Sequence, residues 1–268
     1  MTKKCLYILG TSLLEVFDNF SSKLNVTPSN DYKFDWLCSF GMVKSINTSY
    51  YITDYDHNRI FILNEDWTIV SFKDYKFSRY IVAVKDNLYI VGDESIYKTN
   101  SKLELLGNIT SRDSYYTGIY STDSLIYVTS IKLNISIEIE MSIKIFDLNL
   151  VAYDSITTTP YKPWSISGYN DVLFIGTAEG IICKIVDKII ISSFNGCNGN
   201  EFEINSILFD HFGYMATLCN KDDKMYLFES NSTVSIRSMS TSIDPFDIGF
   251  DSKGRFVVVS SKQISLYF

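Results

Sequence analysis

Residues Tyr50–Phe72 read YYITDYDHNRIFILNEDWTIVSF and hold three short apolar runs joined by polar turns. The runs are rich in Ile, Phe and Tyr, whose side chains suit the pleated, half-buried surface of a β-strand. The turns DYDHN and NED supply Asp and Asn, which favour tight turns through local side-chain hydrogen bonds. The stretch therefore predicts three consecutive strands.

The first two strands of this stretch recur as a pair from one end of the chain to the other. The first member of each pair reads CLYILGT from Cys5, SYYITD, NLYIVGD, LIYVTS, VLFIGTA, GYMATLC and RFVVVSS. The second reads LLEVFD from Leu13, RIFILN, SIYKTN, SIKIFD, IICKIV, KMYLFES and QISLYF. A strand-only repeat of about 40 residues is typical of a β-propeller blade.

Two weaker strands complete each unit. Inner candidates precede the second to seventh pairs (GMVKSI, YIVAVK, GIYST, WSISGY, INSILFD, FDIGFD), and outer candidates follow the first six (KLNVT, WTIVSF, LELLG, LVAYDSI, KIIISSF, TVSIRSM). No segment shows convincing helical periodicity. We therefore expect one all-β domain over residues 1–268, a β-propeller of four-stranded antiparallel blades. Seven pairs favour seven blades, closed between the N- and C-terminal segments, with six blades as the alternative.

One unit resembles a known repeat. FGMVKSINTSYYITDYDHNRIFILNED is similar to an NHL repeat, with a strand ending in Asp54 and Asn58-Arg59-Ile60 opening the next. The last unit is similar in its first half, and the other units keep only the strand pattern. The resemblance implies a propeller of the NHL or WD-repeat kind, although the Gly-His and Trp-Asp signatures of WD repeats are absent. Such propellers are mostly interaction platforms and a few are enzymes, so the fold alone does not decide between them.

Composition restricts the partners and the compartment. The formal net charge is −7, which disfavours nucleic acid, and no apolar run is long enough to span a bilayer. The five cysteines have no paired spacing, which predicts reduced thiols and a cytoplasmic location. The abundance of Ile, Asn, Lys, Ser and Tyr is typical of an AT-rich genome, such as that of a protist or a large DNA virus.

No catalytic motif or cofactor site is predicted. His57 and His211, the two histidines, both lie in Asp-containing turns; an Asp-rich turn can bind a cation, but the simpler interpretation is turn geometry. No Cys/His spacing suggests zinc. Gly176–Gly180 reads as a hairpin turn, and the loop around Cys197 lacks a partner base for a nucleophile.

The fourth pair is stretched. Leu125–Phe146 predicts a long hairpin that turns near Asn134, with residues 131–141 as an insertion. On the returning strand Ile137, Ile139, Met141, Ile143 and Ile145 share one face, and Glu138, Glu140 and Lys144 share the other. The hairpin offers an apolar ribbon to a partner or a second copy, or it covers the neighbouring blade.

The crossings from outer to next inner strand are aromatic: DYKFDWLCSF, DYKFSRYI, RDSYYTG, TPYKPWS and DPFD. Since Tyr, Trp and Arg supply most of the binding energy at interfaces, these crossings predict a binding face. Its candidate residues are Trp36, Arg79, Tyr80, Arg112, Tyr115, Tyr116, Tyr161 and Trp164, joined by Ile137, Glu138 and Glu140 of the hairpin. The alternative is that the rings simply pack between blades.

Together these features predict a non-enzymatic protein-binding scaffold. Two alternatives stay open. The first is a propeller hydrolase or lyase that uses a cation or carboxylates in the central channel. The second is a structural or virion component that assembles through the hairpin.

Overall fold

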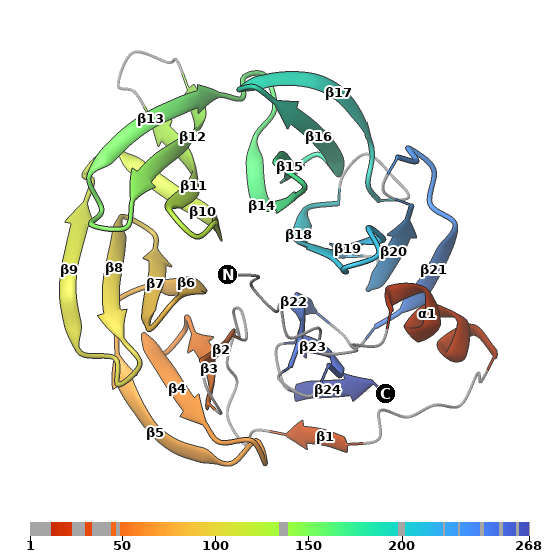
Figure 1. Cartoon of the computed structure of the whole chain (residues 1–268), viewed down its shortest axis with the longest axis horizontal. Helices are drawn as coiled ribbons and strands as arrows, with labels where there is room; N and C mark the ends of the chain where they lie inside the picture. Colours follow the sequence, from red (N-terminus) through yellow and green to blue (C-terminus); the bar gives the residue numbers. More distant parts are fainter. Residues whose placement is uncertain are drawn as a thin grey trace, which may run out of the picture.

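The computed structural model of the chain describes residues 12–22, 30–33, 44–46, 49–133, 139–197, 202–221, 223–229, 231–241, 244–251, 254–260 and 263–267. These residues form six four-stranded antiparallel sheets arranged as the blades of a β-propeller around a central axis (Figure 1). The all-β propeller is therefore confirmed. The favoured count of seven blades is wrong, and the alternative of six is correct.

Five blades are each built from four consecutive strands of the chain. Blade 1 is β2 (Lys44–Ile46), β3 (Ser49–Asp54), β4 (Arg59–Leu63) and β5 (Ile69–Asp74). Blade 2 is β6 (Ser78–Val84), β7 (Asn87–Gly92), β8 (Ser95–Asn100) and β9 (Leu105–Thr110). Blade 3 is β10 (Ser114–Ser121), β11 (Leu125–Leu133), β12 (Ile139–Asp147) and β13 (Ala152–Thr157). Blade 4 is β14 (Pro163–Tyr169), β15 (Val172–Thr177), β16 (Ile181–Val186) and β17 (Ile189–Asn195). Blade 5 is β18 (Ile204–Phe209), β19 (Met215–Cys219), β20 (Lys224–Phe228) and β21 (Arg237–Ser240).

The ring closes in blade 6, which combines the two ends of the chain. It contains β22 (Pro245–Phe250), β23 (Phe256–Ser260) and β24 (Gln263–Tyr267), with β1 (Asn30–Lys33) as the outer strand. β1 runs antiparallel to β24, from Asn30 opposite Leu266 to Lys33 opposite Gln263. The predicted closure between N- and C-terminal segments is thus confirmed, and it gives the last unit the fourth strand that its own sequence lacks.

The first predicted pair is not a blade. Leu13–Asp18, expected as a strand, belongs to the helix α1 (Leu13–Ser22), and Cys5–Thr11 lies outside the described residues. Ser12 and Glu15 form a reciprocal capping box, since each backbone N–H donates to the other's side chain at 3.1 Å. Leu13, Val16 and Phe17 pack into the core shared by blades 5 and 6. The spacing of these three residues follows one face of a helix, a pattern too short to stand out in the sequence.

Six apolar clusters occupy the six interfaces between neighbouring blades. For example, Tyr50 and Leu63 of blade 1 pack with Val257 and Leu266 of blade 6, although these residues are far apart in the sequence. Polar groups of the inner strands add hydrogen bonds to the first residue of the next inner strand: Thr117 to the Pro163 carbonyl (2.8 Å), Ser165 to that of Ile204 (2.7 Å), and Asn205 to that of Pro245 (2.9 Å).

A disulfide joins Cys197 to Cys219, 22 residues later in the sequence. It links the crossing after β17 to the end of β19, so it fastens blade 4 to blade 5. The prediction of reduced thiols is wrong for this pair, because the two cysteines become neighbours only when blades 4 and 5 pack together. Cys183 is a buried thiol whose pKa is raised to about 12 by burial, so it stays protonated and unreactive.

The described part of the chain contains no helix long and apolar enough to cross a membrane.

We expect Phe17→Ala to lower the free energy of unfolding by about 3 kcal/mol or more, because it leaves a cavity between α1 and the core of blades 5 and 6. Chemical denaturation of both proteins measures the difference. Phe212→Ala is the matched control: Phe212 is 61% exposed, and its loss should cost about 0.5 kcal/mol or less. Equal losses in the two variants would contradict the docking of α1.

Replacing Cys197 and Cys219 together with alanine should lower the free energy of unfolding by about 3 kcal/mol, because the loop between them is no longer closed in the unfolded chain. The same loss should follow when the wild type is denatured in a reducing agent, and the reducing agent should leave the double variant unaffected. Peptide mapping that finds the two cysteines unlinked in the purified protein would refute the bond.

Candidate functional site

One face of the ring carries the crossings between blades. In blades 2, 4, 5 and 6 the first residue of the inner strand lies opposite the last residue of the second strand, as Ser78 does with Gly92 and Pro163 with Thr177. The crossings and the turns between second and third strands therefore share a face, which we call the crossing face. Arg79, Tyr80, Tyr115, Tyr116 and Trp164 lie at or near the starts of inner strands on this face, and Arg112 and Tyr161 lie in the crossings themselves. Trp36, Ile137 and Glu138 lie outside the described residues.

Every inner strand from β6 to β22 has a bulge close to the crossing face. In each of these strands the bulge leaves one residue without a partner on the second strand. These residues are Arg79 in β6, Thr117 in β10, Trp164 in β14, Asn205 in β18 and Phe246 in β22. Bulges re-aim side chains and often border functional sites. In blade 2 the bulge places Arg79 at the centre of a cluster from three blades.

Arg79 is held by a carboxylate and flanked by two aromatic rings. Its Nε donates to Asp93 Oδ1 at 2.7 Å, and the guanidinium lies 4.1 Å from the ring centroid of Tyr55 and 5.2 Å from that of Tyr115. Tyr55 in turn donates its hydroxyl to Asp93 Oδ2 at 2.9 Å. Blades 1, 2 and 3 contribute Tyr55, Arg79 with Asp93, and Tyr115, in that order. We call these four residues the Arg79 cluster.

The electrostatics of the cluster favour a charged arginine beside neutral tyrosines. Burial alone would lower the pKa of Arg79, but Tyr115 and Asp93 outweigh it, and the pKa is raised. Burial raises the pKa of Tyr115 well above its usual value, although Arg79 opposes that rise. The Arg79 side chain keeps 25% of its surface exposed and Asp93 keeps 16%. The guanidinium is therefore fixed in orientation but still reachable from solvent.

Tyr80 lies on the inner strand β6 and packs, partly buried, against the core between blades 2 and 3. Burial raises its pKa strongly, Arg79 lowers it, and the carboxylates of Asp247 and Glu203 raise it further. Asp247 belongs to blade 6 and Glu203 precedes β18 of blade 5, so Tyr80 is influenced by groups from the other side of the channel. Asp247 also accepts a hydrogen bond of 2.5 Å from Ser206. Within the described part of the chain, no group of three or more His, Cys, Asp or Glu is placed to hold a metal ion.

A groove beside the Arg79 cluster separates blades 2 and 3. It is a cavity of about 590 Å³ lined by Tyr116, Glu140, Ser142 and Lys144, among others. Lys144 donates to the Ser114 hydroxyl at 2.7 Å and lies 5.4 Å from the ring centroid of Tyr116. Burial lowers the pKa of Lys144. The groove thus contains a partly buried cation that donates a hydrogen bond to a neutral hydroxyl.

The long hairpin rises beside this groove. β11 and β12 pair from Leu125 opposite Asp147 to Leu133 opposite Ile139, and the turn itself lies outside the described residues. The apolar face continues from the core, where Ile143 and Ile145 are buried, to Ile139, which is 52% exposed. β10 also runs alongside, with Ser114 opposite Lys132. The hairpin is therefore an extension of blade 3 at the crossing face, with an apolar side that ends in solvent.

The remaining candidate residues of the predicted binding face differ in how far they are buried. Tyr116 is buried between blades 2 and 3, and Tyr161 is partly buried against the core of blades 3 and 4 while its hydroxyl lies 3.0 Å from that of Ser193. For these two rings, packing between blades is the better interpretation. Trp164 is half-buried with Lys162 5.5 Å from its ring centroid, and Arg112 is exposed.

The sequence did not single out Tyr55 or Asp93. Both lie in turns between second and third strands, and they looked like ordinary turn residues. Tyr55 belongs to the blade before that of Arg79, and Asp93 to the same blade as Arg79; their contacts with Arg79 are visible only in the folded ring. The two histidines are turn residues: the backbone N–H of His57 donates to Asp54 at 3.2 Å, and His211 lies in the turn that Asp210 closes.

Stability should fall as the pH rises above about 10, because tyrosines ionise there in the unfolded chain but stay neutral in the fold. The raised pKa values of Tyr80 and Tyr115 mean that the folded protein holds more protons in this range. Each such tyrosine adds at most about 1.4 kcal/mol per pH unit to the slope. Denaturation between neutral and alkaline pH measures it, and Tyr115→Phe should reduce the slope. An unchanged slope in Tyr115→Phe would contradict the burial of this ring.

Comparison with known proteins supports the propeller fold but identifies no family. The sequence matches no family model and no curated protein. The chain is similar to the crystal structure of a protein of unknown function from Bacteroides caccae, with 12% sequence identity and a TM-score of 0.66. The match covers 78% of this chain and 81% of the other. At this identity the likeness shows that both chains share a propeller architecture.

Proposed function

We propose that this protein is a non-enzymatic binding platform whose protein partner contacts the crossing face at the Arg79 cluster. The observation that carries the proposal is the fixed but accessible guanidinium of Arg79, held by Asp93 between the rings of Tyr55 and Tyr115. Arg and Tyr are the residues that most often supply binding energy at interfaces. A side chain that is already ordered loses less entropy on binding, so the cluster is suited to recognition.

The hairpin extends the proposed surface. Ile139 is an exposed apolar side chain near the tip of the described part of β12, and Lys132 lies 3.9 Å from Glu140 on the neighbouring strand. An apolar centre with charged neighbours is the usual composition of an interface. The partner is a protein rather than nucleic acid in this proposal, because the net charge of −7 opposes a phosphate backbone.

The platform is favoured over a channel enzyme. The polar side chains near the axis, such as Asn205 and Asp247, form hydrogen bonds between blades 5 and 6. These side chains are therefore engaged in holding the ring together. We also propose that the repeats are of the NHL-like kind, on the pattern of Phe40–Asp66.

Affinity purification from the native cell, with quantitative mass spectrometry, tests the proposal. Arg79→Ala and Tyr115→Ala should each reduce capture of the specific partner at least about tenfold, since hot-spot residues contribute about 2 kcal/mol or more. Lys102→Ala is the control, because Lys102 is exposed in a turn on the opposite face. Thermal denaturation establishes that every variant is folded. Capture that is equal in all four proteins would refute the proposal.

Ile139→Glu tests the contribution of the hairpin to partner binding separately from that of the Arg79 cluster. It should weaken capture if the partner covers the hairpin, and Val234→Glu, at another exposed apolar position on blade 5, should not. Light scattering on the same proteins measures their mass in solution. A wild type that is oligomeric and an Ile139→Glu variant that is monomeric would assign the hairpin to self-association instead.

A further inference from the structure

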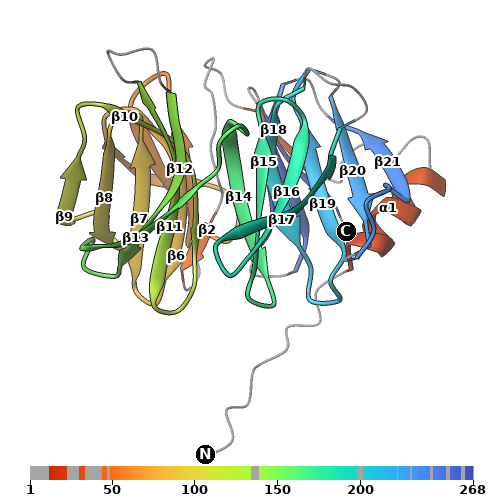
Figure 2. The ribbon, with the colours of Figure 1, turned by 90° about the horizontal axis from the view of Figure 1, so that it is seen from above.

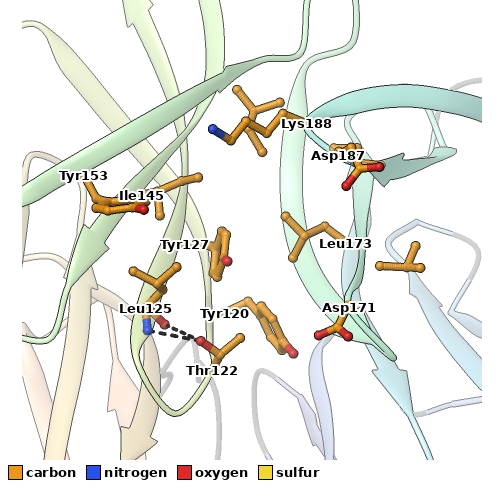
Figure 3. Close-up of a pocket in the computed structure, with 13 residues that line it drawn as sticks. Tyr120, Thr122, Leu125, Tyr127, Ile145, Tyr153, Asp171, Leu173, Asp187 and Lys188 are labelled. Atoms are coloured by element: carbon orange, nitrogen blue, oxygen red, sulfur yellow. Dashed lines mark hydrogen bonds between the residues drawn. The ribbon is translucent and has the colours of Figure 1, made fainter.

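A second cavity lies on the side of the ring opposite the crossing face, between blades 3 and 4. Its volume is about 300 Å³, at the small end of the range for ligand pockets. It is open at the turns that join β10 to β11, β14 to β15, and β16 to β17, and Figure 3 shows the side chains around it. The two blades meet here without filling the space between them.

Aromatic rings from blade 3 form one wall. Tyr120 and Tyr127 lie with their ring centroids 6.0 Å apart, and Tyr153 of the outer strand lies at the edge of the cavity (Figure 3). Gly168 lets the ring of Tyr120 approach the backbone of β14, because a Cβ at this position would lie 2.6 Å from the ring. Leu173 and Ile185 of blade 4 form the facing apolar wall.

Two carboxylates lie at the rim on the side of blade 4. Asp171 and Asp187 are exposed, and each lies in a two-residue turn whose residues have positive φ, between 48° and 67°. Such turns are tight, so they fix the direction in which the carboxylates leave the backbone. Neither aspartate forms an ion pair within the part of the chain that the structure describes.

Lys188, a cationic side chain at the rim, is already engaged in an ion pair. Lys188 of blade 4 forms an ion pair with Asp154 of blade 3, and this pair bridges the two blades beside the cavity. The charge around the cavity is therefore negative, with Asp171 and Asp187 uncompensated. Burial raises the pKa of Tyr120 and of Tyr127, and the nearby Asp171 raises both further, so the rings stay neutral.

We infer that this cavity binds a small organic ammonium cation. Aromatic faces attract a cation through their quadrupole, and the apolar wall accepts its methyl or methylene groups. The two carboxylates at the rim add charge complementarity, and the cavity is too small for a large ligand. The chemistry is shared by a free amine and by a lysine side chain of a partner protein.

Titration of the full-length protein with choline, putrescine and Nα-acetyl-lysine amide, followed by calorimetry and by NMR of the tyrosine rings, tests the inference. At least one of these probes should bind saturably in the millimolar range or tighter at low salt. The neutral alcohol in which carbon replaces the nitrogen of choline should not. Tighter binding of choline or putrescine indicates a free amine as the natural ligand, and tighter binding of the lysine amide indicates a partner side chain.

Two variants test the site itself. Asp171→Asn combined with Asp187→Asn should weaken binding roughly tenfold, and Tyr127→Leu should weaken it as well while circular dichroism verifies the fold. Asp86→Asn, in the corresponding turn of blade 2, should bind as the wild type does. The inference is overturned if none of the three probes binds saturably, if the neutral alcohol binds equally well, or if binding survives in both site variants.

Discussion

The hydrogen-bonded pairing of β1 with β24 is the constraint on which the rest of the structure depends. Each blade presents apolar residues on both of its faces, and these are covered only when a neighbour lies on each side. Because the ring returns to its starting point, blade 1 covers blade 6, and no blade face is left in water. The N-terminal strand completes the last sheet, so the two ends of the chain stabilise each other.

Closure also decides where polar and charged groups meet. With six blades, neighbouring crossings lie close enough for Tyr55 of blade 1 and Tyr115 of blade 3 to flank Arg79 of blade 2. The bulge at Arg79 turns the side chain out of the regular alternation of the strand. The candidate site is thus a product of the ring geometry and of one local irregularity.

Blade 3 serves both candidate sites through the two faces of β12. Glu140, Ser142 and Lys144 line the groove toward blade 2, while Ile143 and Ile145 face blade 4. Further along the same interface, away from the crossing face, the packing with blade 4 opens into the tyrosine-lined cavity (Figure 2 shows the blades from the side). The long hairpin is an extension of the blade that both sites share.

The sequence by itself determined the last six strand pairs, their order and the closure of the ring, because alternating apolar residues and turn residues are local signals. It also indicated that Arg79, Tyr80 and Tyr115 would share a face, since crossings fall on one side of any propeller. It did not determine the number of blades, because Leu13–Asp18 has a composition that suits a strand and becomes a helix only by capping and by docking on blades 5 and 6. Only the tertiary structure decided the partners of Arg79, the bond between Cys197 and Cys219, and the cavity between blades 3 and 4. The rings that flank Arg79, the disulfide and the cavity each join residues from different blades, and their proximity depends on how the blades pack around the axis.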